Sequence, residues 1–147
     1  MKNFLLDTDV LSLLAPSRAG LSKRFTDWLE QTDAEGRIYL SAVTVYEIEK
    51  GIALLEHAKA TAKAANLRLW LAGLVATYQD KIIPIDAEVA AIAGQLDARA
   101  ISAGQHPGMA DAIIAGIAKV HDAIVVTRNT KHFLPFGIEF VTPDEVE

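Results

Sequence analysis

Short apolar runs alternate with segments of helical periodicity along nearly the whole chain, and this alternation restricts the possible folds more than any other feature. The strand-like runs cover residues 4–6, 37–40, 81–85, 123–127 and 138–141. The segments between them carry apolar residues at helical spacing or are rich in alanine. Such alternation is typical of a parallel sheet flanked by helices and joined by right-handed crossovers. We therefore predict an α/β fold of three layers, with a parallel sheet of about five strands.

The size and charge of the chain further limit the number of domains and the kinds of ligand that we expect. Its 147 residues, 51% of them hydrophobic, are enough for one compact domain, and we expect a single domain over 1–147. The net charge of −5 argues against broad electrostatic binding to a polyanion, so any nucleic-acid contact must be local or assisted by a cation. Without cysteine the chain has no disulfide or thiolate metal site. No uncharged apolar stretch approaches about 18 residues, so we expect a cytoplasmic protein that does not enter a membrane.

The segment 44–78 has helical spacing and predicts a helical hairpin with its turn near Asn66. Pro84 lies in the third strand-like run, and because proline cannot donate a backbone hydrogen bond, it predicts an edge strand. The hairpin also carries more apolar residues than one helix face normally buries. These residues are Leu67, Leu69, Trp70, Leu71 and Leu74. They are equally consistent with core packing and with an interface to a partner.

Three acidic residues that are distant in the chain follow strand-like runs or stand near the start of helical ones: Asp7, Glu47 and Asp111. Each has an ordinary structural explanation. Asp7 could cap a helix, and Asp111 could interact favourably with a helix dipole. Glu47 could form a capping box with Thr44. In a parallel sheet, however, the strand ends share one edge, where these carboxylates and the polar segment 127–129 would converge.

A cluster of carboxylates needs protons or a cation to persist. Two carboxylate charges about 4 Å apart repel by roughly 4 kcal/mol at an effective dielectric near 20. Hard oxygen ligands suit Mg²⁺ or Mn²⁺, and Mg²⁺ commonly binds one or two carboxylates with waters and phosphate, which favours phosphate chemistry. Zinc is disfavoured because cysteine is absent and the histidines lack paired ligand spacing. His132 could approach the site from its loop, but we do not count it among the ligands.

Four blocks of the sequence together resemble PIN-domain ribonucleases, and in particular the VapC and FitB toxins of bacterial toxin–antitoxin pairs. The blocks are 5–9, 41–51, 110–115 and 125–133. The resemblance covers nearly the whole chain and implies a PIN-like fold. It also implies an endoribonuclease that depends on Mg²⁺ or Mn²⁺, forms a homodimer and is inhibited by a VapB-like antitoxin. The implied substrate is RNA, with a structured RNA such as tRNA as one candidate.

The resemblance carries a set of site residues onto this chain. They are Asp7, Glu47, Asp111, Thr127 and Asn129. Asp7 and Asp111 would bind the metal, and Glu47 would position or deprotonate the attacking water. Thr127 and Asn129 would orient water or substrate. The apolar surplus of the hairpin would then be a dimer interface or a groove for the antitoxin.

Two positions depart from the pattern of the family. Asp9 stands where these proteins usually have Asn, which adds negative charge near Asp7. Asn129 stands where many PIN domains carry a fourth acid, so this chain offers one carboxylate fewer there for a second metal.

Two other functions fit parts of the sequence. The segment Asp7-Thr8-Asp9 also resembles the nucleophile motif of haloacid-dehalogenase-type phosphatases, in which Asp7 would be phosphorylated and Asp9 would act as acid or base. No downstream lysine and acidic pair in the required order supports this interpretation. A receiver-type signalling domain would use Asp86 as phosphate acceptor and Thr127 as the switch residue. Receivers usually have adjacent acids after the first strand, however, and here a threonine separates the two acids.

Overall fold

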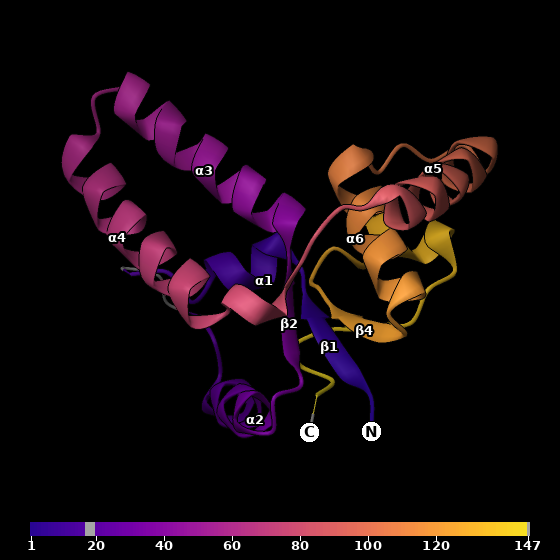
Figure 1. Ribbon diagram of the computed structural model, residues 1–147, viewed down its shortest axis with the longest axis horizontal. Coiled ribbons are helices and arrows are strands. Elements are labelled where there is room, and N and C mark those ends of the chain that lie inside the picture. The colour runs from indigo at the N-terminus through magenta and orange to yellow at the C-terminus, as the bar shows by residue number, and fades with distance from the viewer. Residues whose placement is uncertain (17–19, 147) are drawn as a thin grey trace.

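A parallel β-sheet forms the centre of the protein (Figure 1). The computed structural model describes residues 1–16 and 20–146, and within them the sheet has five strands in the order β3-β2-β1-β4-β5. The strands are β1 (Asn3–Leu6), β2 (Ile38–Ser41), β3 (Ile82–Ile83), β4 (Ala123–Val126) and β5 (Phe140–Val141). All neighbouring strands pair in parallel. The predicted parallel sheet is confirmed, and so is the edge position of β3 that Pro84 indicated.

Helices cover both faces of this sheet. They are α1 (Thr8–Ser12), α2 (Lys23–Ala34), α3 (Ala42–His57), α4 (Thr61–Thr77), α5 (Ala87–Ser102), α6 (Met109–Val120) and α7 (Thr130–Phe133), with the short 3₁₀ helices η1 (Gln79–Lys81) and η2 (Leu134–Phe136). Figure 1 shows α5 and α6 on one side of the sheet, and α1, α2 and the α3–α4 hairpin on the other. The three predicted layers are therefore present.

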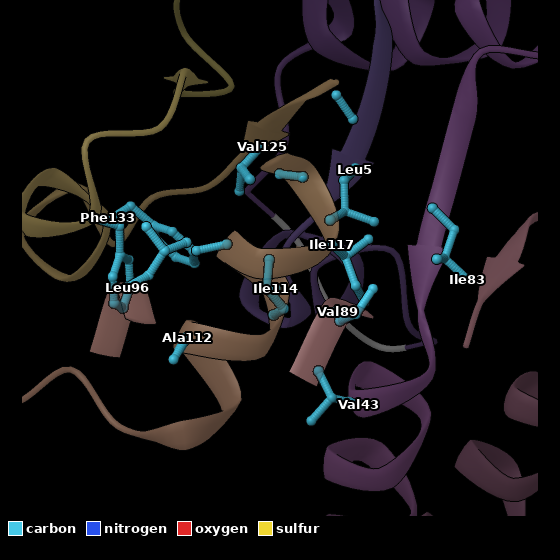
Figure 2. Close-up of a cluster of buried hydrophobic side chains, with 14 of the residues drawn as sticks. Leu5, Val43, Ile83, Val89, Leu96, Ala112, Ile114, Ile117, Val125 and Phe133 are labelled. Carbon is cyan, nitrogen blue, oxygen red and sulfur yellow. The ribbon is translucent and has the colours of Figure 1, made fainter. Parts of the chain in front are cut away.

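The pleat of the sheet sends alternate side chains into two separate hydrophobic clusters. Leu5 of β1 and Val125 of β4 belong to the first cluster, together with Ile117 of α6 (Figure 2). Leu6 and Val126, the next residues along the same strands, belong to the second cluster, which α1–α4 cover. All four residues of β4 are buried, as expected for a parallel strand with helices on both faces.

Helices α5 and α6 pack against each other at short range. A Cβ added at Gly116 would lie 3.0 Å from the Ala93 Cβ and 3.0 Å from the Val89 carbonyl oxygen. Only glycine permits this approach without a shift of the neighbouring backbone. The close contact fixes the position of α6, whose first turn carries Asp111.

The α3–α4 hairpin turns earlier than the sequence predicted. The turn covers residues 58–60, so Asn66 lies inside α4 and the prediction of a break there is wrong. Lys59 adopts a φ of 64°, and the Ala60 N–H donates to the Leu55 carbonyl at 2.9 Å, which closes α3 with a left-handed residue. Glycine usually holds such a position. A lysine there gives no turn signal in the sequence.

Most of the apolar surplus of the hairpin packs against the second cluster. Leu71 is buried, and Leu67, Trp70 and Leu74 are partly buried against that cluster. Leu69, by contrast, is 75% exposed. Core packing therefore accounts for most of these residues. Across residues 1–16 and 20–146, this hairpin included, no helix combines the length and apolar character that a membrane span requires.

Candidate active site

Polar side chains gather at the carboxyl edge of the sheet, where β1, β2 and β4 end. Asp7 directly follows β1, and Thr127 directly follows the neighbouring strand β4. The Asp7 N–H donates to the Val126 carbonyl at 2.9 Å, which holds these two strand ends together. Helix α3 begins immediately after β2, and α6 begins close enough for Asp111 to act electrostatically on Asp7. The predicted convergence of distant segments is thus observed.

Asp7 is buried, with 2% of its surface exposed. It caps α1, because its Oδ1 accepts a hydrogen bond from the Thr8 N–H at 2.8 Å. Its Oδ2 accepts a second one from the Thr127 hydroxyl at 2.7 Å. Burial raises the pKa of Asp7 to about 8, the bond from Thr127 opposes this rise, and the charge of Asp9 adds to it. Asp7 can therefore cap α1 and still serve as a residue of the active site.

Glu47 does not form the capping box that its spacing from Thr44 allowed. Helix α3 begins earlier, and its N-cap is Ser41, whose Oγ accepts from the Val43 N–H at 3.0 Å. Glu47 instead lies in the second turn, where its Oε1 accepts a hydrogen bond from the Thr8 hydroxyl at 2.6 Å. The capping-box prediction is wrong, and the carboxylate is directed toward α1 and the site.

Two threonine hydroxyls that the sequence analysis missed connect α1 to α3. Thr8 Oγ1 lies 2.9 Å from Thr44 Oγ1, in addition to its bond to Glu47. Thr44 is buried and stands one helical turn before Glu47, so both side chains face α1. The only signal in the sequence was the position of Thr8 directly after Asp7.

Asp111 is the third residue of α6 and is partly buried. Its Oδ2 lies 2.8 Å from His132 Nδ1, a contact between α6 and α7. Burial raises the pKa of Asp111, and the hydrogen bond from His132 opposes the rise. The charges of Glu47 and Asp9 raise the pKa further. His132, which was left out of the predicted site, therefore lies within it and holds one of its carboxylates.

Thr127 and Asn129 lie at the start of the segment that follows β4. Thr127 is fully buried, and its hydroxyl accepts a hydrogen bond from the Asn129 N–H at 2.9 Å while it donates to Asp7. The Thr127 hydroxyl therefore holds Asp7 in place and also bonds the backbone of Asn129. Asn129 contributes a backbone contact here, and the predicted role of its side chain in orienting water or substrate stays a prediction.

Asp9 brings a further carboxylate to this edge. Its Oδ2 accepts from the Arg128 N–H at 3.3 Å and lies 3.6 Å from Arg128 Nε. Its Oδ1 is buried and has no hydrogen-bond partner among the described residues. A buried carboxylate oxygen without a partner is costly, and a cation would satisfy it. The donor set of hard oxygens therefore fits a Mg²⁺ or Mn²⁺ ion.

The carboxylates are nevertheless not arranged as a closed metal cage. Within residues 1–16 and 20–146, no group of three or more acidic or histidine side chains is positioned to hold an ion. A site of the Mg²⁺ type does not need one, because this ion commonly uses one or two carboxylates and retains several waters. The arrangement is consistent with an open site at which substrate phosphate and water complete the coordination.

Comparison with known proteins identifies the class to which this fold and site belong. The chain is a member of the PIN-domain family, whose model matches residues 4–134. Within that class it is similar to "Toxin FitB" of Neisseria gonorrhoeae, at 35% identity over 139 residues, 95% of this chain and 96% of that protein. It is also similar to "VapC ribonuclease Y4jK" of Sinorhizobium fredii, at 32% identity over 145 residues, 96% of this chain and 97% of that protein. The structure of FitAcB from Neisseria gonorrhoeae matches with a TM-score of 0.79 and 34% identity, over 97% of this chain and 99% of that chain.

The PIN-domain match argues against the two alternative functions. Asp86, the acceptor that a receiver domain would use, follows the edge strand β3 and is separated from β1 by β2. Its Oδ1 accepts from the Val89 N–H at 2.9 Å and caps α5. Asp7, the nucleophile of the phosphatase interpretation, is buried and holds the site together through two hydrogen bonds.

Proposed function

We propose that this protein is a metal-dependent endoribonuclease and the toxin of a toxin–antitoxin pair. The observation that carries the proposal is the gathering of Asp7, Asp9, Glu47 and Asp111 at one sheet edge, where their charges act on one another. The PIN-domain family and the relatives named as a toxin and as a ribonuclease support the same conclusion.

Asp7 and Asp111 would hold a Mg²⁺ or Mn²⁺ ion, with Asp9 beside them. When bound, such an ion polarises a phosphate and lowers the pKa of a water molecule. Thr127 keeps Asp7 in place, and His132 keeps Asp111 in place. These contacts restrict the carboxylates to one orientation before substrate arrives.

Glu47 is suited to act on the attacking water. One of its oxygens, Oε1, is held by the Thr8 hydroxyl, and the side chain is partly exposed at the site. Its other oxygen can accept a proton from water or orient it toward the phosphate. Thr8 would be a positioning residue, because it acts on the reaction through Glu47.

A groove of about 390 Å³ leads away from Thr8 and Glu47 between α1 and the α3–α4 hairpin. Its walls include Ile48, Leu67 and Trp70. An apolar segment of an antitoxin fits such a surface, and its basic residues would be attracted to the adjacent carboxylates. The homodimer implied by the family resemblance is part of this proposal.

The function is tested by incubating the purified protein with tRNA in Mg²⁺, in Mn²⁺ and in chelator. Asp7→Asn and Asp111→Asn are compared with Asp86→Asn, a matched control that alters a helix-capping carboxylate after the edge strand. We expect cleavage by the wild type and the control, and a loss of at least about a hundredfold in both site variants, which corresponds to about 2.7 kcal/mol of barrier. Cleavage that survives chelation would contradict the metal mechanism.

A further inference from the structure

We propose that Tyr46 and Lys50, on the exposed side of α3, bind the nucleotide next to the scissile phosphate. The base would stack on the Tyr46 ring, and the Lys50 ammonium would contact a phosphate. This inference rests on the proposed function, because it names the residues that hold the RNA at that same site. It adds a substrate-binding element outside the cluster of carboxylates.

Tyr46 is exposed although the helix around it is well packed. It is 57% exposed, whereas its neighbours Thr44 and Ile48 are buried. It directly precedes Glu47, the carboxylate that Thr8 directs toward the site. An exposed aromatic ring on the helix that carries Glu47 is available for stacking on a base.

Lys50 provides a cation on the same face of the helix. Its Nζ lies 5.6 Å from the centre of the Tyr46 ring, at the spacing of one helical turn. Among the residues described, Lys50 makes no ion pair, whereas Lys2 and Lys23 each pair with an aspartate. In a chain with a net charge of −5, such a cation offers the local phosphate contact that binding to RNA requires.

The helix places the two groups near Glu47, because Lys50 follows Glu47 by three residues, and residues three apart are neighbours on a helix surface. A helix rises 1.5 Å per residue, so Tyr46 and Lys50 span about 6 Å along α3, with Glu47 between them in sequence. Bases that stack on aromatic side chains must be unpaired, as in single strands and loops. The pair therefore favours an RNA with an unpaired nucleotide beside the cleaved bond.

The first measurement is binding of a short single-stranded oligoribonucleotide that contains one 2-aminopurine, with chelator present so that the RNA stays intact. Tyr46→Ala should weaken binding about tenfold and remove the fluorescence quenching caused by stacking, and Tyr46→Phe should retain both. Lys50→Gln should weaken binding and reduce the salt dependence by about one charge. The matched controls are Leu69→Ala, another exposed apolar residue, and Lys119→Gln at the far end of α6, and both should bind like the wild type.

The second measurement separates this inference from the proposed function. With tRNA and Mn²⁺, Tyr46→Ala should raise KM more than it lowers kcat, because the residue binds substrate without touching the metal. A wild type that cleaves RNA while Tyr46→Ala leaves affinity, quenching and KM unchanged would overturn the inference alone. The same result accompanied by weaker antitoxin binding would reassign the pair to the partner protein and overturn it as well. A wild type that neither binds nor cleaves RNA would refute the proposed function itself.

Discussion

At the amino end of the sheet, acidic side chains lie beside cations, whereas Asp7, the most buried acid at the carboxyl end, has no cation beside it among residues 1–16 and 20–146. Lys2 Nζ lies 2.7 Å from Asp122 Oδ1 and 3.7 Å from Glu139 Oε1. Arg37 Nη1 lies 2.6 Å from Glu35 Oε1. The two pairs of Lys2 are substantially exposed and contribute little to stability, whereas Arg37 and Glu35 are less exposed. They neutralise charge where the strands begin.

At the carboxyl end, Asp9 lies beside Arg128 and Asp111 contacts His132, but Asp7 is held differently. Asp7 is held by a hydroxyl and a backbone N–H, and within residues 1–16 and 20–146 no cation pairs with it. Asp9 and Asp111 lie close enough to raise its pKa further. Under the proposed function, this unneutralised carboxylate is the feature that a bound cation would stabilise.

The largest effect on stability is expected from Thr127→Val. This change removes the donor to Asp7 Oδ2 and leaves a buried carboxyl oxygen and the Asn129 N–H without their partner. We expect a loss of about 1–3 kcal/mol in the free energy of unfolding, measured by denaturant titration. Thr127→Ser keeps the hydroxyl and should lose much less. A loss in Thr127→Val no larger than in Thr127→Ser would show that the hydroxyl contributes no more than the packing of the methyl group, and would contradict this prediction.

A smaller effect is expected from His132→Ala, which removes the side chain that holds Asp111. We expect Mn²⁺ to bind about tenfold more weakly by titration calorimetry, because groups that orient metal ligands typically contribute that much or more. His121→Ala is the control, since His121 lies at the end of α6 remote from the carboxylates. Unchanged Mn²⁺ affinity in His132→Ala would contradict the assignment of Asp111 as a ligand.

The smallest effect is expected at the amino end. Lys2→Ala removes the pairs with Asp122 and Glu139, yet all three side chains are substantially exposed. The melting temperature should fall by no more than about 4 °C, and RNA cleavage should be unchanged. A loss of cleavage in this variant would show that the two ends are coupled and would break the comparison.

The sequence predicted the location of the site because a parallel sheet constrains it. Asp7 and Thr127 follow adjacent strands, and the register of β1 with β4 brings them within hydrogen-bond distance. Asp111 could be placed for a similar reason, since it opens the helix that packs beside those strands. The shared edge of a parallel sheet, together with the start of α6, was therefore sufficient to predict that these three residues converge.

Contacts that depend on helix rotation and on short helices could not be predicted in this way. The direction of Glu47 follows from the start of α3 at Ala42, whereas the sequence also allowed a cap at Thr44. The position of His132 depends on the single-turn helix α7, which is fixed by burial of Phe133 in the first cluster. A helix of four residues is too short to show a periodic pattern in the sequence, so this packing could not be predicted.

The central claim is that the carboxyl end holds a buried acid whose charge its hydrogen bonds compensate only in part, so that a proton or a cation stabilises it further. The pH dependence of stability tests this claim most directly. The pKa of Asp7 is raised in the folded protein from 3.8 to about 8, so its protonated form stabilises the fold at low pH, and this stabilisation is lost as pH rises toward and through about 8. Metal-free wild type should therefore melt at least about 2–4 °C lower at pH 8 than at pH 5, relative to Asp7→Asn, and Mn²⁺ should reverse the difference. Parallel pH profiles for wild type and Asp7→Asn, with no response to Mn²⁺, would contradict the account.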